Sequence, residues 1–181
     1  MRTLPRRLPK CPALFRRFAA DTRGATAIEF GLIATPFFAL MFAIIEVAMV
    51  FFGGQILEKA TQDASRKILT GQAQLANFDQ TAFKNEVCNS LQIIFSCGSV
   101  FVDVKNFTQF SNVNITKPID SSGNFTTAGF SYSPGNASDI VVVRVMYLWQ
   151  LFVPGMGFNL ADVAGNKKLL MATAVFRTEP Y

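Results

Sequence analysis

The sequence predicts an α+β protein: a long N-terminal transmembrane helix continues into a stem, and a small module of one helix and an antiparallel sheet follows. Three observations predict this class. An apolar run fills residues 28–52, a polar segment with helical periodicity follows it, and from residue 99 apolar and polar residues alternate as in a β-strand. The 181 residues are enough for one domain and an anchor. We divide the chain into a basic leader (1–24), a transmembrane helix (25–54), a helical stem (55–72) and an α+β domain (77–181).

The net charge of +5 is concentrated at the N-terminus. Residues 1–24 contain seven Lys or Arg and one Asp, whereas the rest of the chain contains ten basic and eleven acidic residues. A cationic segment beside a membrane span stays on the cytoplasmic side, so we expect a cytoplasmic N-terminus and an exported C-terminal domain. Because this charge flanks a span, we do not expect the chain to bind nucleic acid.

The apolar run is long enough to cross a bilayer as one helix. Its 25 residues from Ile28 to Phe52 would extend about 37 Å, whereas a bilayer core is about 30 Å thick. Pro36 interrupts the run, but a proline can kink a helix in lipid without ending it. The Gly53-Gly54 pair predicts a weak point before the stem. Either lipid or neighbouring helices would cover the apolar side chains of this segment.

Two acidic residues accompany this run. Glu29 either complements the positive end of the helix dipole or serves a function, since a carboxylate at the membrane edge is costly without a partner. We favour a function: if the chain is cut after Gly24, the new ammonium group of Ala25 on a neighbouring subunit is a natural partner for Glu29. Glu46 either reaches the outer interface or faces a polar partner on another helix.

Helical periodicity continues through the stem and returns in a second helix. The stem helix, residues 55–70, is followed by Gly71, a residue suited to a helix C-terminus. Its expected buried face comprises Ile56, Ala60, Ala64, Lys67 and Ile68, apolar except for the lysine. A second helix at 81–95 begins after a capping residue, Asn77 or Asp79. Its apolar stripe comprises Phe83, Val87, Leu91 and Ile94.

Two of the three cysteines, Cys88 and Cys97, lie in the exported part, and Cys11 lies in the leader. We expect a disulfide between the two exported cysteines. Nine residues of straight helix cover about 13 Å, whereas a disulfide needs Cα atoms within about 7 Å. The helix must therefore end and fold back near Ser96-Cys97-Gly98.

Three strands are expected in the C-terminal region. The first begins at Ser99, with Val100, Val102 and Val104 on its buried side. The second is residues 139–153, as one long strand or as two strands broken near Trp149. The third is residues 166–178. The polar residues 108–138 predict a long exposed excursion with a short hairpin around Gly123.

The residue types and motifs of the chain give little support for an enzyme. The chain has no histidine, and therefore no histidine-based catalytic triad or metal site. No glycine-rich phosphate loop follows a strand, and the carboxylates form no paired acid–base motif. We expect no enzymatic activity, no metal and no cofactor.

The N-terminal half resembles a known family. Arg23-Gly24-Ala25-Thr26-Ala27-Ile28-Glu29-Phe30 is similar to a type IV prepilin signal, in which the glycine precedes the apolar core. This signal, Pro36 within the apolar helix, Ile45-Glu46 and the stem at 60–67 together resemble the TadE-like proteins. These are minor pilin-like components of tight-adherence (Flp, type IVb) pilus systems.

The resemblance implies cleavage by a prepilin peptidase between Gly24 and Ala25, with Glu29 and Phe30 acting in processing or assembly. It implies insertion in the bacterial inner membrane with the domain in the periplasm, and a role in assembling or priming the pilus. The implied partners are the peptidase, other pilin-like subunits, the inner-membrane pilus platform and the lipid bilayer. An alternative function is a signal-anchored periplasmic binding module that uses the 108–138 excursion and takes no part in a filament.

Overall fold

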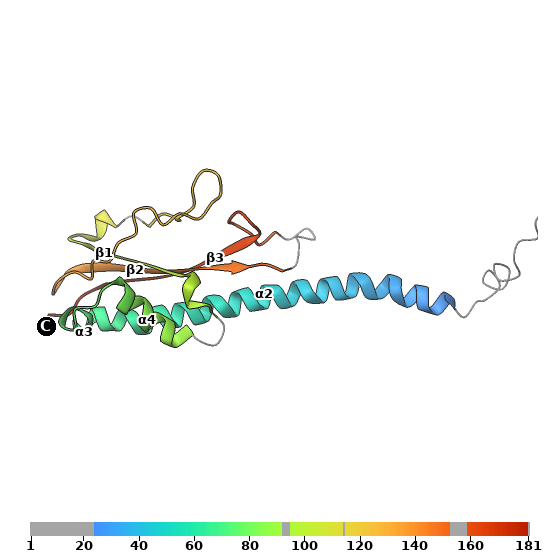
Figure 1. Ribbon diagram of the computed structural model, residues 1–181, viewed down its shortest axis with the longest axis horizontal. Helices are drawn as coiled ribbons and strands as arrows, with labels where there is room; N and C mark the ends of the chain where they lie inside the picture. Colours follow the sequence, from blue (N-terminus) through green and yellow to red (C-terminus); the bar gives the residue numbers. More distant parts are fainter. Residues whose placement is uncertain (1–23, 92–94, 114, 153–158, 181) are drawn as a thin grey trace, which may run out of the picture. The chain divides into compact units, whose positions relative to one another are not determined.

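The computed structural model describes residues 24–91, 95–113, 115–152 and 159–180. Nearly the whole predicted leader, with Cys11, lies outside these residues, as does Ile94. The chain divides into two compact units, Met1–Ala43 and Ile44–Tyr181. The predicted α+β class is confirmed: a long apolar helix precedes short helices and a three-stranded antiparallel sheet (Figure 1).

Helix α2, Ala25–Leu69, contains both the apolar run and the stem. Pro36 lies inside the helix without ending it, and the Oγ1 of Thr35 donates to the carbonyl oxygen of Gly31 at 2.8 Å. Helix α2 also passes through Gly53 and Gly54 without a break, so the expected weak point does not interrupt it. After Leu69 the chain turns at Gly71, whose φ of 76° is the left-handed conformation that glycine adopts readily.

Two short helices follow this turn. Helix α3 is Gln72–Leu75, and helix α4 is Gln80–Leu91. The carboxylate of Asp79 accepts a hydrogen bond from the backbone N–H of Ala82 at 2.7 Å. Asp79 is therefore the N-cap of α4, which decides between the two expected capping residues.

The sheet contains β1 (Val100–Phe107), β2 (Ile140–Gln150) and β3 (Lys167–Arg177) in the order β1-β2-β3. Both neighbouring pairs are antiparallel, with Asp103 opposite Arg144 and Arg144 opposite Thr173. The second strand is continuous through Trp149, which settles the choice between one long strand and two. The three strands lie side by side in Figure 1.

The main core lies between one face of the sheet and helices α2 and α4. Within the stem, Leu57, Ala60, Thr61, Ala64 and Ile68 are fully or almost fully buried. The expected buried face is thus nearly right, but Leu57 is buried and Ile56 is only half-buried. A buried face that combines small residues with two large ones lets a helix pack closely on a sheet.

The opposite face of the sheet is covered by the excursion after β1, which the sequence predicts as exposed. Phe125 and Phe130 pack with Met146 of β2 in a second, smaller apolar cluster. The expected turn at Gly123 is present, because Ile119 and Phe125 form an antiparallel bridge around it. The prediction of an exposed excursion is therefore wrong for this part, since its aromatic residues bury apolar surface.

The expected disulfide joins Cys88 and Cys97, with their Cα atoms 5.7 Å apart. Helix α4 is described as far as Leu91, whose carbonyl oxygen accepts from the N–H of Phe95 at 3.2 Å, and Phe95 itself is not helical. The short 3₁₀ helix η2, Cys97–Ser99, then leads into β1. Because the chain has left the helix before Cys97, the two cysteines can come together.

The disulfide gives a stability prediction. Replacing Cys88 and Cys97 by serine should lower the free energy of unfolding by about 2–3 kcal/mol, because the unfolded chain is no longer constrained by this small loop. Denaturant unfolding of the full chain in detergent, followed by Trp149 fluorescence, measures the change. Cys11→Ser is the control and should leave the unfolding free energy unchanged. Equal stability of all three proteins would contradict the prediction.

Candidate functional site

The N-terminal end of helix α2 and the glycine before it, residues 24–30, which we call its head, contain the residues that the sequence assigns to processing. Gly24 immediately precedes the helix and Ala25 is its first residue. Glu29 follows Ala25 by four residues, which places it one turn further along and on the same side of the helix. Glu29 and Phe30 are exposed, the latter by 71%. The head therefore offers a carboxylate beside large apolar side chains.

The apolar residues of α2 form a surface of membrane-spanning length. Helix α2 is long and apolar enough to cross a bilayer. Its exposed large apolar side chains are Ile28, Phe30, Leu32, Ile33, Phe37, Phe38, Leu40, Phe42, Ile44, Ile45, Met49, Phe51 and Phe52. Such exposure is unfavourable in water, so this helix fits a single-pass membrane anchor.

Glu46 marks the start of the contact between α2 and the sheet. Its side chain is only 9% exposed, although it lies within the apolar run. Its carboxylate Oε1 accepts a hydrogen bond from the backbone N–H of Phe152, two residues after β2. An ionised acceptor strengthens such a bond, and the partner offsets part of the cost of burying an acid. The local sequence gives no sign of this partner, which lies 106 residues along the chain.

Gly53 lies where α2 approaches the sheet most closely among its glycines. A Cβ atom placed on Gly53 would lie 3.0 Å from Cζ3 of Trp149 and 3.4 Å from Cδ1 of Leu170. A Cβ atom on Gly54 would meet nothing within 4 Å. The glycine at 53 therefore makes room for the indole ring, whereas its neighbour has no such role.

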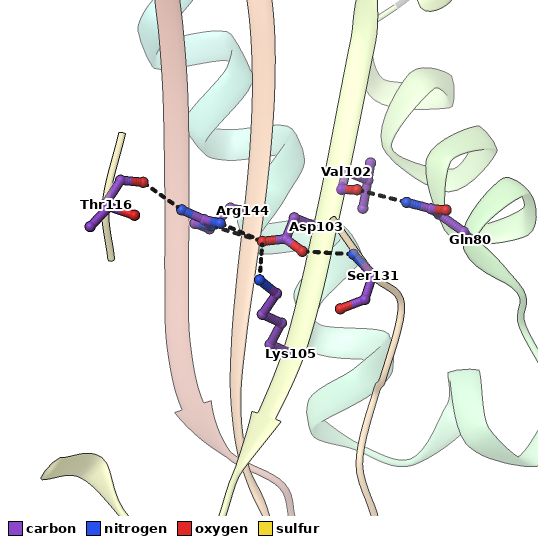
Figure 2. Close-up of polar contacts among 7 residues, drawn as sticks. All are labelled: Gln80, Val102, Asp103, Lys105, Thr116, Ser131 and Arg144. Atoms are coloured by element: carbon purple, nitrogen blue, oxygen red, sulfur yellow. Dashed lines mark hydrogen bonds and ion pairs between the residues drawn. The ribbon is translucent and has the colours of Figure 1, made fainter. Parts of the chain in front are cut away.

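A buried ion pair joins β1 to β2 on the outer face of the sheet. Figure 2 shows Asp103 and Arg144 pointing toward each other from the two strands. The guanidinium Nη2 and Nε lie 2.5 Å and 3.1 Å from Oδ2 of Asp103, and both side chains are buried. Nζ of Lys105 lies 3.7 Å from the same oxygen and is partly exposed. With its two central charges paired and buried, this network is suited to holding the strands together.

The same ion pair fastens the excursion to the sheet. The backbone N–H of Ser131 donates to Oδ1 of Asp103 at 2.9 Å, and Nη1 of Arg144 donates to the carbonyl oxygen of Thr116 at 2.8 Å (Figure 2). Both backbone groups belong to the 108–138 excursion. Deleting this segment would therefore remove hydrogen-bond partners from two buried charges as well as any surface that a ligand could use.

Two groups of the excursion have shifted pKa values. The backbone N–H of Asn124, with a smaller contribution from that of Ser122, holds the pKa of Asp120 below its usual value. Burial raises the pKa of Tyr132 to about 12, and the negative charge of Asp79 adds to this shift. Among the described residues, no three His, Cys, Asp or Glu side chains are grouped to hold a metal ion.

The two adjacent glycines give a matched pair of variants. Gly53→Ala should lower the free energy of unfolding by about 1–3 kcal/mol, because the new methyl group forces Trp149 or the helix to move. Gly54→Ala should raise it by about 0.5–1 kcal/mol, because alanine loses less backbone entropy in a helix. Unfolding followed by Trp149 fluorescence measures both. Changes of the same sign in the two variants would rule out close packing at Gly53.

The ion pair gives a double-mutant prediction. Arg144→Met should cost about 3–5 kcal/mol, since it leaves Asp103 buried without its main partner, and Asp103→Leu together with Arg144→Met should cost much less. Lys105→Met is the control and should cost under about 1 kcal/mol, because this lysine is partly exposed. Unfolding free energies of the wild type, Asp103→Leu, Arg144→Met and the double variant complete the cycle, with Lys105→Met measured beside them. Additive losses in the double variant would show that the two charges are not coupled.

Comparison with known proteins bears on the N-terminal part of the chain. Residues 24–66 match the family model described as TadE-like protein. No curated protein and no solved structure matches the chain. The matched segment runs along α2 from its head into the stem, includes Gly24, Glu29 and Glu46, and ends before the sheet. Residues 24–66 are thus similar to the TadE-like proteins, and the resemblance predicted from the sequence is confirmed.

Proposed function

We propose that this protein is a minor pilin-like membrane component of a tight-adherence type IVb pilus, which takes part in pilus assembly or priming through lateral packing of helix α2. The TadE-like match over residues 24–66 is the observation that carries this proposal. The matched segment coincides with the helix that exposes a long apolar surface. A helix of this kind can exchange lipid contacts for contacts with similar helices, because both bury the same apolar atoms.

The proposed orientation has the N-terminus in the cytoplasm and the α+β domain in the periplasm. The cationic residues of the leader support the first part. The disulfide between Cys88 and Cys97 supports the second, because disulfides persist in oxidising compartments such as the periplasm and are rare in the cytosol. A bacterial inner membrane satisfies both requirements.

The head of α2 would act after cleavage between Gly24 and Ala25 by a prepilin peptidase. Cleavage removes the cationic leader and leaves an ammonium group on Ala25. Glu29 is exposed at the same helix head, so its carboxylate can pair with the ammonium of a neighbouring subunit in an apolar setting. The proposed partners are therefore the peptidase, other pilin-like subunits and the membrane platform on which they assemble.

The contacts at Glu46 and Gly53 would hold the α+β domain against helix α2. The Glu46 carboxylate binds the Phe152 N–H, and Gly53 admits Trp149 against the helix. Residues 44–69 of α2 thus belong to the same compact unit as the sheet. When the helix packs beside another subunit, the sheet would be positioned with it.

Cleavage of the leader is the first step to test. In cells that contain the prepilin peptidase, the mature chain should begin at Ala25, and Gly24→Arg should retain Met1 because the peptidase no longer accepts the site. Intact-mass measurement of the purified chain distinguishes the two products. Gly31→Ala is the matched control, since a Cβ atom there meets nothing within 4 Å, and it should be cleaved normally.

The same cells separate cleavage from packing. Glu29→Ala should be cleaved but should reduce the yield of assembled pili several-fold, whereas Glu58→Ala, an exposed acid of the stem, should not. Pilus yield is measured by shearing and immunoblotting of the major pilin. A wild-type chain that still begins at Met1 while pili assemble normally would contradict the proposal.

A further inference from the structure

The two edges of the sheet differ in how they are closed. At β1, the carbonyl oxygen of Val102 accepts from Nε2 of Gln80 at 2.8 Å. The N–H and C=O of Val104 pair with Ser131 and Ser133 at 2.8 Å and 2.9 Å. The middle of the β1 edge is therefore occupied by the chain itself. The other edge of the sheet belongs to β3.

The even-numbered residues of β3 direct their backbone groups toward β2. The carbonyl oxygen of Asn166 accepts from Leu151, and the N–H of Thr178 donates to Asp139. Because backbone groups alternate along a strand, the odd-numbered residues direct theirs outward. Lys167 is paired with Val163 on that outer side.

The outer edge is open between its two ends. Beyond Lys167, the N–H of Leu169 donates to the carboxylate of Asp162, and at the far end the N–H of Glu179 donates to the carbonyl oxygen of Leu69. Between these closures, the outward backbone groups of Met171, Thr173 and Val175 make no hydrogen bond to any described part of the chain.

This open edge lacks the features that usually protect edge strands. Residues 169–176 contain neither a charged residue nor a proline. The side chain of Val175 is 42% exposed and that of Thr173 is also exposed. Edge strands that stay unpaired are commonly blunted by charges, proline or bulges, so an unprotected edge is a template for another strand.

A groove of about 330 Å³ lies beside this edge, between β3 and the stem of α2. Ala174 and Phe176 line one side, and Ser65 and Arg66 line the other. Ser65 is 3% exposed, and its hydroxyl has no hydrogen-bond partner among the described residues. A buried hydroxyl without a partner is unfavourable, which points to a polar group that enters this groove. Arg66 is exposed in this groove and forms no ion pair with a described residue.

We propose that the groove and the open edge of β3 bind an extended segment of another pilin-like subunit, which adds a fourth strand to the sheet. Its backbone would pair with Met171, Thr173 and Val175, as in other cases of strand addition. A polar group of the segment would reach Ser65, and an acidic side chain would meet Arg66. The choice of a pilin-like subunit rests on the proposed function.

A second copy of this chain does not fit these requirements. Leu170 lies near Gly53 and Glu179 is bonded to Leu69, so β3 runs in the same direction as α2. Antiparallel pairing of two β3 edges would therefore run residues 44–69 of the two α2 helices in opposite directions, which does not suit subunits inserted the same way in one membrane. The edge of a second copy, residues 169–176, also offers no acid for Arg66. These two mismatches favour a different chain as the occupant.

Amide hydrogen exchange tests the proposal at single residues. In the isolated full chain in detergent, the amides of Met171, Thr173 and Val175 should exchange fast, while those of Ala172 and Ala174 exchange slowly. Co-expression with each other pilin-like subunit of the same system should, for one of them, slow the three odd-numbered amides about 100-fold or more. Slow odd-numbered amides in the isolated chain, or fast ones with every subunit, would overturn the proposal.

Variants of the edge and the groove complete the test. Thr173→Pro removes one outward N–H and should abolish the protection, whereas Thr173→Ser should retain it. Arg66→Glu should weaken the complex at least tenfold, whereas Lys117→Glu should change it little, because Lys117 is an exposed residue of the excursion and does not line the groove. Efficient disulfide dimerisation of Thr173→Cys in a Cys11→Ser background would place a second copy at the edge and overturn the proposal. Failure here with normal leader cleavage and pilus yield would leave the proposed function standing.

Discussion

The packing of the C-terminal half of α2 on the sheet is the constraint on which the second compact unit, Ile44–Tyr181, depends. One continuous helix emerges from an apolar run and must then bury a face against β-strands. Close approach requires small residues where backbone and ring meet, and the helix supplies Gly53, Ala60 and Ala64, with Leu57 and Ile68 filling the space between them. Helix α4 and the disulfide then close the remaining side of this core.

Hydrogen bonds fix both ends of this contact. Near its start, the Glu46 carboxylate holds the Phe152 N–H, and at its end the carbonyl oxygen of Leu69 accepts from Glu179. The second bond uses one of the carbonyl groups that a helix leaves unpaired at its C-terminus. The outer side of β3 is closed at its two ends but not in the middle, so the same arrangement that secures the sheet to the helix leaves part of this edge open.

Sequence patterns predicted the helices and strands well, but they predicted less well which residues are buried and which segments contact each other. The apolar run, the stem, Gly71 and the three strands are short-range signals of period, length and turn chemistry, so they could be read directly. The 108–138 excursion was expected to be exposed because it is rich in polar residues. Its few aromatic residues cover the outer face of the sheet, however. Asp103 is also buried on this face, where it forms an ion pair with Arg144 of the next strand. Strand register, which composition does not reveal, brings these charges together.

By itself, the sequence determined that this protein has a membrane-length helix with a prepilin-like head, a disulfide between Cys88 and Cys97, and an α+β domain. These features depend on neighbouring residues, on charge asymmetry and on cysteine usage. Only the tertiary structure decided the role of Glu46, the reason for a glycine at 53 and the open edge of β3. Each of these depends on contacts between segments far apart in the chain, because burial and hydrogen-bond satisfaction are properties of the packed structure and not of local sequence.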